Sequence, residues 1–174
     1  MYEKIFLTFA IVIYCTMVTT VLTACSSSED TPEVVNTPTF VQTTFTFSAT
    51  QDMLDYCDIT VKYNDGTGEK TESMTTTEWK KVIKSTLPAT HSFTRIVTLK
   101  PDKDASNAEK LSYTNGYYFE SDILNGKGES MNDGSILSST GSSTISGANF
   151  VKAVAEGTFD KTRSFSFDKK GNLQ

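Results

Sequence analysis

Residues 40–49, Phe-Val-Gln-Thr-Thr-Phe-Thr-Phe-Ser-Ala, contain the pattern that decides the fold. β-Branched and aromatic residues dominate this segment, and the larger side chains recur at every second position. The residues that share the more apolar face are Val41, Thr43, Phe45 and Phe47. Successive side chains of a strand point to opposite faces, so we predict an antiparallel strand with one buried and one solvated face.

The same alternation returns further along the chain. Cys57, Ile59, Val61 and Tyr63 form a second inward set, and the Asn-Asp-Gly-Thr-Gly sequence at 64–68 suits a hairpin loop. Arg95 falls in phase with the apolar residues of its segment. Further strands are predicted over residues 69–74, 88–99, 116–124 and 164–167.

Three segments are less regular. Residues 77–85 fit either a strand or a helix, because the chain is rich in strand formers there while Trp79, Val82 and Ile83 have helical spacing; the neighbouring strands favour a strand. Residues 146–157 predict a short helix that Ser146 caps and Gly157 ends. Nine of the seventeen residues from 130 to 146 are Ser or Thr, which is typical of a mobile loop or a polar edge strand.

The first 25 residues have the features of a membrane-targeting segment. Residues 5–24 form an apolar run without charge, Pro or Gly, and Leu22-Thr23-Ala24-Cys25 resembles the lipobox of bacterial lipoprotein signal peptides. The resemblance implies removal of residues 1–24 and a lipid such as palmitate on Cys25; an uncleaved anchor is the alternative. Residues 25–39 read as a flexible tether and 40–174 as the domain. Ser26 and the Ser/acid run after it resemble outer-membrane retention and surface-export signals, which implies an outer-membrane lipoprotein, surface-exposed if the run is an export signal.

Composition narrows the classes of function. The chain has 16 Lys+Arg, 21 Asp+Glu and a net charge of −5, which argues against nucleic-acid binding. With one His and three Cys, we expect no metal site and no cofactor. We expect Cys57 to be a buried, inert thiol and His91 to lie at the surface or at a strand end.

These observations predict an all-β fold, an immunoglobulin-like antiparallel sandwich of six to seven strands with one short helix near the C-terminus; a small barrel is the alternative. Residues 54–100 resemble immunoglobulin-like domains that follow lipoprotein signals, and the resemblance implies no particular function.

We expect a monomeric, non-catalytic binding or structural module. An aromatic cluster offers Tyr118, with Tyr113, as a contact for a glycan or an envelope protein. The alternative is a secreted-side hydrolase that uses paired carboxylates.

Overall fold

The computed structural model describes residues 36–131 and 134–174. The predicted signal peptide 1–24, the lipidation site Cys25 and most of the predicted tether lie outside the described residues. The first strand begins at Pro38, two residues before the predicted start of the domain.

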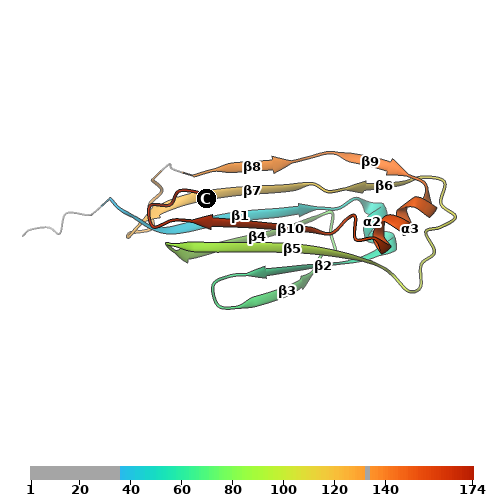
Figure 1. Ribbon diagram of the computed structural model, residues 1–174, viewed down its shortest axis with the longest axis horizontal. Helices are drawn as coiled ribbons and strands as arrows, with labels where there is room; N and C mark the ends of the chain where they lie inside the picture. The colour runs from blue at the N-terminus through green and yellow to red at the C-terminus, as the bar shows by residue number, and fades with distance from the viewer. Residues whose placement is uncertain (1–35, 132–133) are drawn as a thin grey trace, which may run out of the picture. The chain divides into compact units, whose positions relative to one another are not determined.

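Two four-stranded antiparallel sheets make up most of the domain (Figure 1). Sheet A has the strand order β4 (Glu78–Thr86), β1 (Pro38–Ser48), β7 (Tyr117–Asn125) and β8 (Ile136–Ser139). Sheet B has the order β10 (Lys161–Phe167), β5 (Ala89–Leu99), β2 (Cys57–Asn64) and β3 (Glu69–Ser73). A two-stranded sheet C pairs β6 (Leu111–Thr114) with β9 (Ser142–Ile145).

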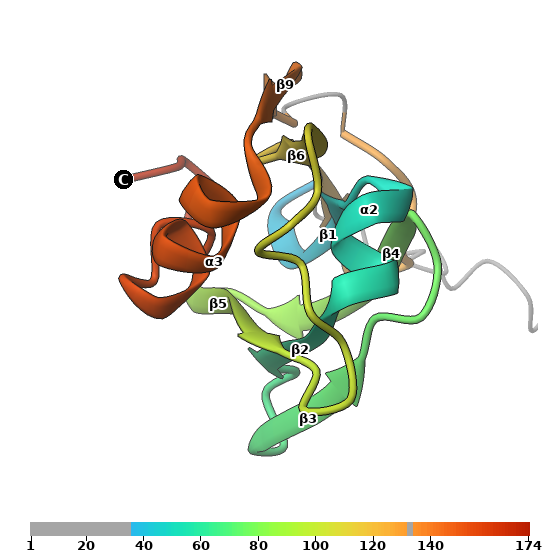
Figure 2. The same ribbon diagram turned by 90° about the vertical axis from the view of Figure 1, so that its right-hand side faces the viewer.

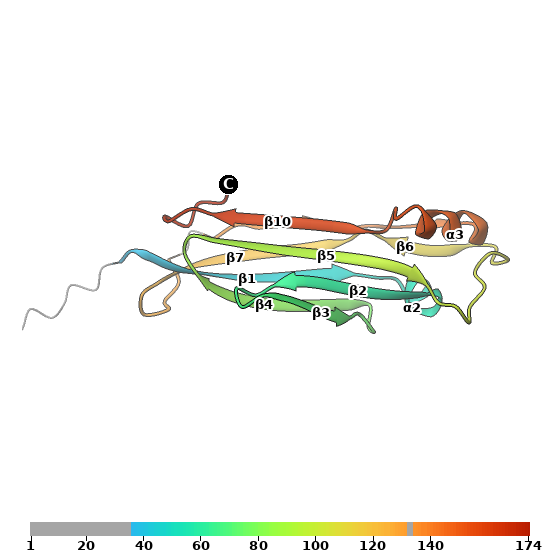
Figure 3. The ribbon, with the colours of Figure 1, turned by 60° about the horizontal axis from the view of Figure 1, so that its bottom comes forward.

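Aromatic side chains hold sheets A and B face to face. Phe45 of β1 stacks on Phe93 of β5 with ring centroids 4.2 Å apart, and Phe119 of β7 stacks on Phe165 of β10 at 3.6 Å. All four rings are buried, and the two layers can be followed in Figure 3. The period-two pattern therefore predicted the inward faces of these strands correctly, and a β-sandwich-like domain is the result.

The described residues contain ten strands and two helices, more than the six to seven strands and one helix predicted. The additional elements are α2 (Gln51–Tyr56), β6, β8 and β9. α2 is capped at its N-terminus by the Thr50 side chain. The predicted C-terminal helix is confirmed as α3 (Gly147–Ala155), with Ser146 as its cap. Figure 2 shows both helices at the same end of the sandwich.

The segment with mixed signals, residues 77–85, is a strand. β4 pairs with β1 along its whole length, and Trp79 and Ile83 face the core opposite Phe47 and Thr43. Packing against β1 thus decides in favour of the period-two pattern over the helical spacing.

The Ser/Thr-rich segment forms edge strands rather than a loop. β8 pairs with β7 and β9 with β6 in one continuous register, since Tyr117 lies opposite Ser139 and Thr114 opposite Ser142. β6 and β7 therefore follow one another along one side of a long two-stranded ribbon, and β9 and β8 follow one another along the other side (Figure 1).

Candidate functional site

Tyr118 lies on the outer face of sheet A, as its alternation with the buried Phe119 requires. It is half-buried, and its cross-strand neighbours are Thr46 on β1 and Ser138 on β8. Its hydroxyl donates a hydrogen bond to Oε2 of Glu120 over 3.1 Å. The ring is thus held in one orientation among hydroxyl groups.

A second row of side chains extends this face. Across the sheet, Val82, Thr44, Glu120 and Ile136 lie opposite one another on β4, β1, β7 and β8. Val82 is 51% exposed and Ile136 65% exposed. The outer face of sheet A therefore combines an aromatic ring and exposed aliphatic groups with a carboxylate and hydroxyls.

Tyr113 does not join Tyr118 on this face. It lies on β6, whose residues Leu111 and Tyr113 face the core side, and its ring packs on that of Phe159 with centroids 4.9 Å apart. The continuous register of β6 and β7 places odd-numbered residues inward and even-numbered residues outward. The two tyrosines that the sequence grouped together thus lie on opposite faces of the ribbon.

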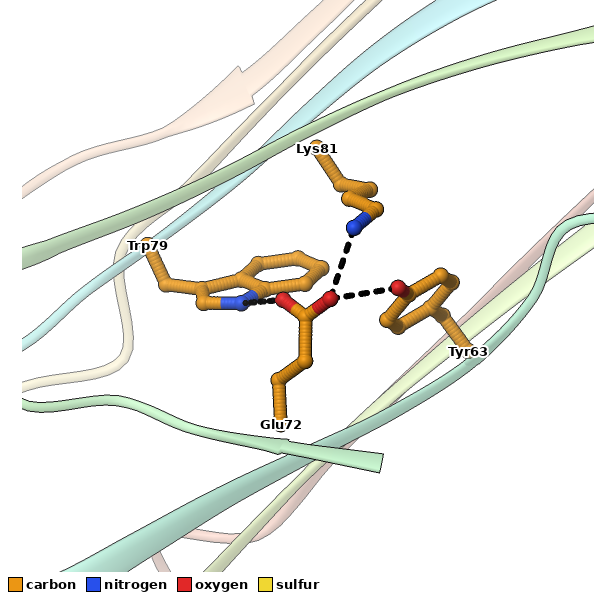
Figure 4. Close-up of polar contacts among 4 residues, drawn as sticks. All are labelled: Tyr63, Glu72, Trp79 and Lys81. Carbon is orange, nitrogen blue, oxygen red and sulfur yellow. Dashed lines mark hydrogen bonds and ion pairs between the residues drawn. The ribbon is translucent and has the colours of Figure 1, made fainter. Parts of the chain in front are cut away.

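A polar cluster that sequence reasoning missed joins the two sheets at one side of the sandwich. Glu72 of β3 accepts hydrogen bonds from the Tyr63 hydroxyl (2.5 Å), from Trp79 Nε1 (2.9 Å) and from Lys81 Nζ (2.6 Å). Figure 4 shows the three donors converging on the one carboxylate. Because Tyr63 belongs to sheet B and Trp79 and Lys81 to sheet A, this Glu72 cluster connects the edge strands of both sheets.

The donors also set the ionisation of the cluster. Hydrogen bonds from Lys81 and Tyr63 lower the pKa of Glu72 to about 2. Hydrogen bonding to Glu72 raises the pKa of Lys81, and burial, followed by the same carboxylate, raises that of Tyr63. A carboxylate held ionised by three donors is a poor general base, so the cluster is suited to fixing the sheets together.

The strand register contains the signal that could have revealed this cluster. Glu72 lies directly opposite Val61, which is fully buried, so both side chains point to the same inner face. An acid at an inward position predicts a buried donor. Which donor it meets depends on β4 lying beside β3 across the sandwich, and local sequence does not contain that information.

Arg95 is fully buried, which agrees with its position in phase with apolar residues. Its guanidinium donates to the backbone oxygens of Ser48 (2.7 Å) and Phe159 (2.8 and 3.2 Å) and to Asn115 Oδ1 (2.7 Å). Burial lowers the pKa of Arg95 to about 10, and Asp160 partly opposes this effect. Arg95 thus ties the end of β1, the residues before β7 and the segment after α3 together.

His91 is buried, so the expectation of a surface histidine is wrong; it is the third residue of β5, near that strand's beginning. Its Nδ1 lies 2.8 Å from Thr43 Oγ1 and its Nε2 lies 2.9 Å from Ser85 Oγ. Burial lowers the pKa of His91, which favours the neutral ring. The two hydroxyls give the imidazole the partners that allow it to replace an apolar residue between the sheets.

Cys57 is 2% exposed, in the inward position that the sequence predicted. Burial raises the pKa of its thiol to about 11, so the reactive thiolate is scarce at neutral pH. A pocket of about 230 Å³ adjoins it, lined also by Asp58 and Lys100. The Lys100 ammonium donates to the Leu54 carbonyl at 2.6 Å, so a local acceptor already engages this charge.

No family model, curated protein or solved structure matches this chain. Across residues 36–131 and 134–174, no helix has the length and apolarity that a membrane span needs. Nor do three His, Cys, Asp or Glu side chains of these residues gather in an arrangement fit for a metal ion.

Proposed function

We propose that this chain is a non-catalytic lipoprotein of the cell envelope whose β-sandwich is a binding module. The observation that carries the proposal is the position of Tyr118, partly exposed on the outer face of sheet A and hydrogen-bonded to Glu120. A glycan or an envelope protein is the ligand class that fits this face. The polar residues that join the sheets support a non-catalytic role, since the buried His91 and Arg95 and the partly exposed Glu72 already have partners within the fold.

Recognition would combine stacking with hydrogen bonding. A sugar ring lying on Tyr118 covers the ring face, while the exposed Ser138 beside it offers a hydroxyl and Glu120 offers acceptor oxygens. Stacked aromatic contacts gain through buried area as well as through the ring face. A protein ligand would also cover Val82 and Ile136, which lie one row away.

The anchor in this proposal is a lipid on Cys25, inserted into the outer membrane, with residues 25–39 as the tether. The support is the lipobox-like sequence at 22–25. Metabolic labelling with a palmitate analogue tests it: the parent chain should incorporate label, and Cys25→Ala should not. Intact mass of the native protein should show loss of residues 1–24; a mass that still includes Met1 argues against the anchor.

An immunoglobulin-like topology is part of the same proposal. In that fold two antiparallel pairs, one in each sheet, form the common centre, and the strand pairs β1–β4 and β2–β5 are arranged in this way. The strand that flanks β1 on its other side is β7, which comes late in the chain, whereas an immunoglobulin domain uses its first strand there. We therefore propose a variant of the fold with this position filled from the C-terminal half.

The test of the binding surface is a glycan array followed by affinity measurement on any ligand found. Tyr118→Ala should weaken binding by about 10- to 100-fold if the ring is a hot spot. Tyr118→Phe keeps the ring and should lose much less. Thr98→Ala, an exposed position on β5 in sheet B, is the matched control and should bind as the parent does. Equal binding by Tyr118→Ala and the parent would refute the assignment of this face.

A further inference from the structure

The four outer edges of the sandwich differ in their charge. β4 carries four charged side chains, β3 three and β10 two. Charged residues, lysine above all, are the usual means by which an edge strand avoids pairing with another chain. The fourth edge, formed by β8 and continued by β9, has no charged residue from Gly134 to Ile145.

This uncharged edge is also open. Every residue from 136 to 144 is exposed. Ile136 and Leu137 lie on it, and they are two of the three large hydrophobic residues that the described part of the chain exposes. Gly134 to Ile145 contains no proline either, so the edge lacks the sequence features that normally block strand addition.

The order of residues along the edge suggests its partner. Residues 137–145 read Leu-Ser-Ser-Thr-Gly-Ser-Ser-Thr-Ile, which is a chemical palindrome about Gly141. When this sequence runs antiparallel to itself about Gly141, Leu137 meets Ile145 and every other pair matches hydroxyl with hydroxyl or glycine with glycine. We propose that the β8–β9 edge pairs with the same edge of a second copy, giving a two-fold symmetric dimer.

The side chains fit this register. Leu137 lies opposite the buried Phe119, and Ile145 lies opposite the buried Leu111, so both face the core side of their ribbon. Directly opposed residues of an antiparallel pair share one face. Leu137 of one copy and Ile145 of the second copy therefore meet on the same face, where each covers apolar surface of the other.

The backbone groups fit it as well. The Ser121 N–H donates to the Ser135 carbonyl over 2.8 Å, so residue 135 directs its carbonyl towards β7. Beyond β8, the Thr114 hydroxyl donates to the Gly141 carbonyl over 2.6 Å, so this odd-numbered residue also directs its carbonyl inward. Backbone groups alternate in direction along a strand, and the even-numbered residues of β8 and β9 therefore direct theirs to the open side. Pairing about Gly141 places even-numbered residues opposite one another, such as Ser138 opposite Thr144 of the second copy. Donors and acceptors then face each other along the new ladder.

A dimer formed in this way replaces the monomer that we expect from the sequence. It is an isologous contact in which β8 of each copy pairs with β9 of the other, so that sheet A of one copy continues into sheet C of the second copy. Its apolar and hydroxyl pairs bring no like charges together despite the net charge of −5. A strand of a different protein added to the same edge would instead leave the purified chain monomeric.

Charge exchange across the proposed pair provides the first test. Ser138→Lys with Thr144→Lys places lysine opposite lysine twice in the dimer, whereas Ser138→Lys with Thr144→Glu places opposite charges there. Both positions are exposed, and they lie roughly 20 Å apart along the edge of one copy, so neither variant creates a strong contact within the chain. We expect the Lys/Lys variant to raise the dimer dissociation constant of the detergent-purified full chain about tenfold and the Lys/Glu variant to restore it. Equal constants for the two variants, or a monomeric parent at every concentration, would overturn the proposal.

Disulfide formation tests the register itself. Ser139 faces Ser143 of the second copy, so mixing Ser139→Cys chains with Ser143→Cys chains under mild oxidation should give a covalent dimer. Each variant alone, and the parent with its own cysteines, are the controls, since two copies of residue 139 lie about 13 Å apart in this register. Cross-linking of either variant alone to the same extent as the mixture would contradict the register about Gly141.

Discussion

Replacing Glu72 by Gln should destabilise the domain by removing the charge that holds its two sheets together at one side. The change preserves the size of the side chain and one acceptor oxygen. It removes the ion pair with Lys81 and weakens the bonds from Tyr63 and Trp79. The substitution therefore isolates the contribution of the carboxylate charge.

The structure sets the size of the effect. The pKa of Glu72 falls from 4.5 to about 2 in the fold. One pKa unit corresponds to about 1.4 kcal/mol, so the ionised carboxylate would stabilise the fold by about 3 kcal/mol if solvent did not screen it. The side chain is 38% exposed and that of Lys81 31% exposed, so water screens the charges. We expect Glu72→Gln to lower the free energy of unfolding by about 1–2 kcal/mol at pH 7.

Acidification should remove the difference between parent and variant. A carboxyl group whose pKa is lower in the folded than in the unfolded state stabilises the fold above the unfolded pKa and loses this effect as pH falls through the folded pKa. For Glu72 the window therefore runs from about pH 4.5 down to about pH 2. The Gln variant, which has no proton to gain at this position, should not lose stability from this source.

Urea unfolding followed by tryptophan fluorescence measures both effects, because Trp79 is the one tryptophan of the chain and belongs to the Glu72 cluster. Lys81→Met and the double variant complete a double-mutant cycle, in which the coupling between Glu72 and Lys81 should disappear at low pH. A difference between parent and Glu72→Gln of the same size at pH 7 and at pH 2.5 would refute the reasoning.

Three residues that are fully buried give further predictions. Arg95→Met should cost about 2–5 kcal/mol in thermal unfolding, because the carbonyls of Ser48 and Phe159 lose their donor; a melting temperature equal to that of the parent would contradict this. Cys57→Ser should cost about 1–3 kcal/mol, and rapid labelling of the native thiol would show its burial to be wrong. His91, whose pKa is lowered, should contribute a loss of stability as pH falls below about 6.5, and His91→Gln should abolish that part of the pH dependence.

Alternation in the sequence was enough to predict the inward faces of β1, β2 and β5, because each strand buries one face against the other sheet. The same rule applied to β5 predicts that His91 is buried, since it is in phase with Phe93 and Arg95. The expectation was a surface or strand-end position, and the structure shows that two hydroxyl partners satisfy the imidazole between the sheets. Position in the pattern was thus a better guide than residue type.

Features that depend on contacts between distant strands were not predictable in this way. α2 has six residues, too few for a helical period, and it depends on the Thr50 cap and on Asp52, which accepts hydrogen bonds from the backbone and hydroxyl of Ser112 at 2.6 Å. The Glu72 cluster likewise depends on which strands form the edges of the two sheets. A single sequence without aligned relatives predicts where strands lie along the chain more readily than which strands pair with each other in a sheet.

The partners of the inward polar residues indicate where function is to be sought. His91, Arg95 and Glu72 are the reactive side-chain types that an enzyme site would use, and each engages hydroxyls, carbonyls or donors of its own fold at 2.5–3.2 Å. A ligand could engage them only by competing with contacts that join the two sheets, at a cost of about 1–3 kcal/mol for each buried partner left unsatisfied. The ring of Tyr118 and the backbone of the β8–β9 edge can be covered without breaking such contacts. Binding at these two surfaces therefore breaks the fewest contacts within the fold. For each surface, substitutions are available that change the surface and leave the core intact.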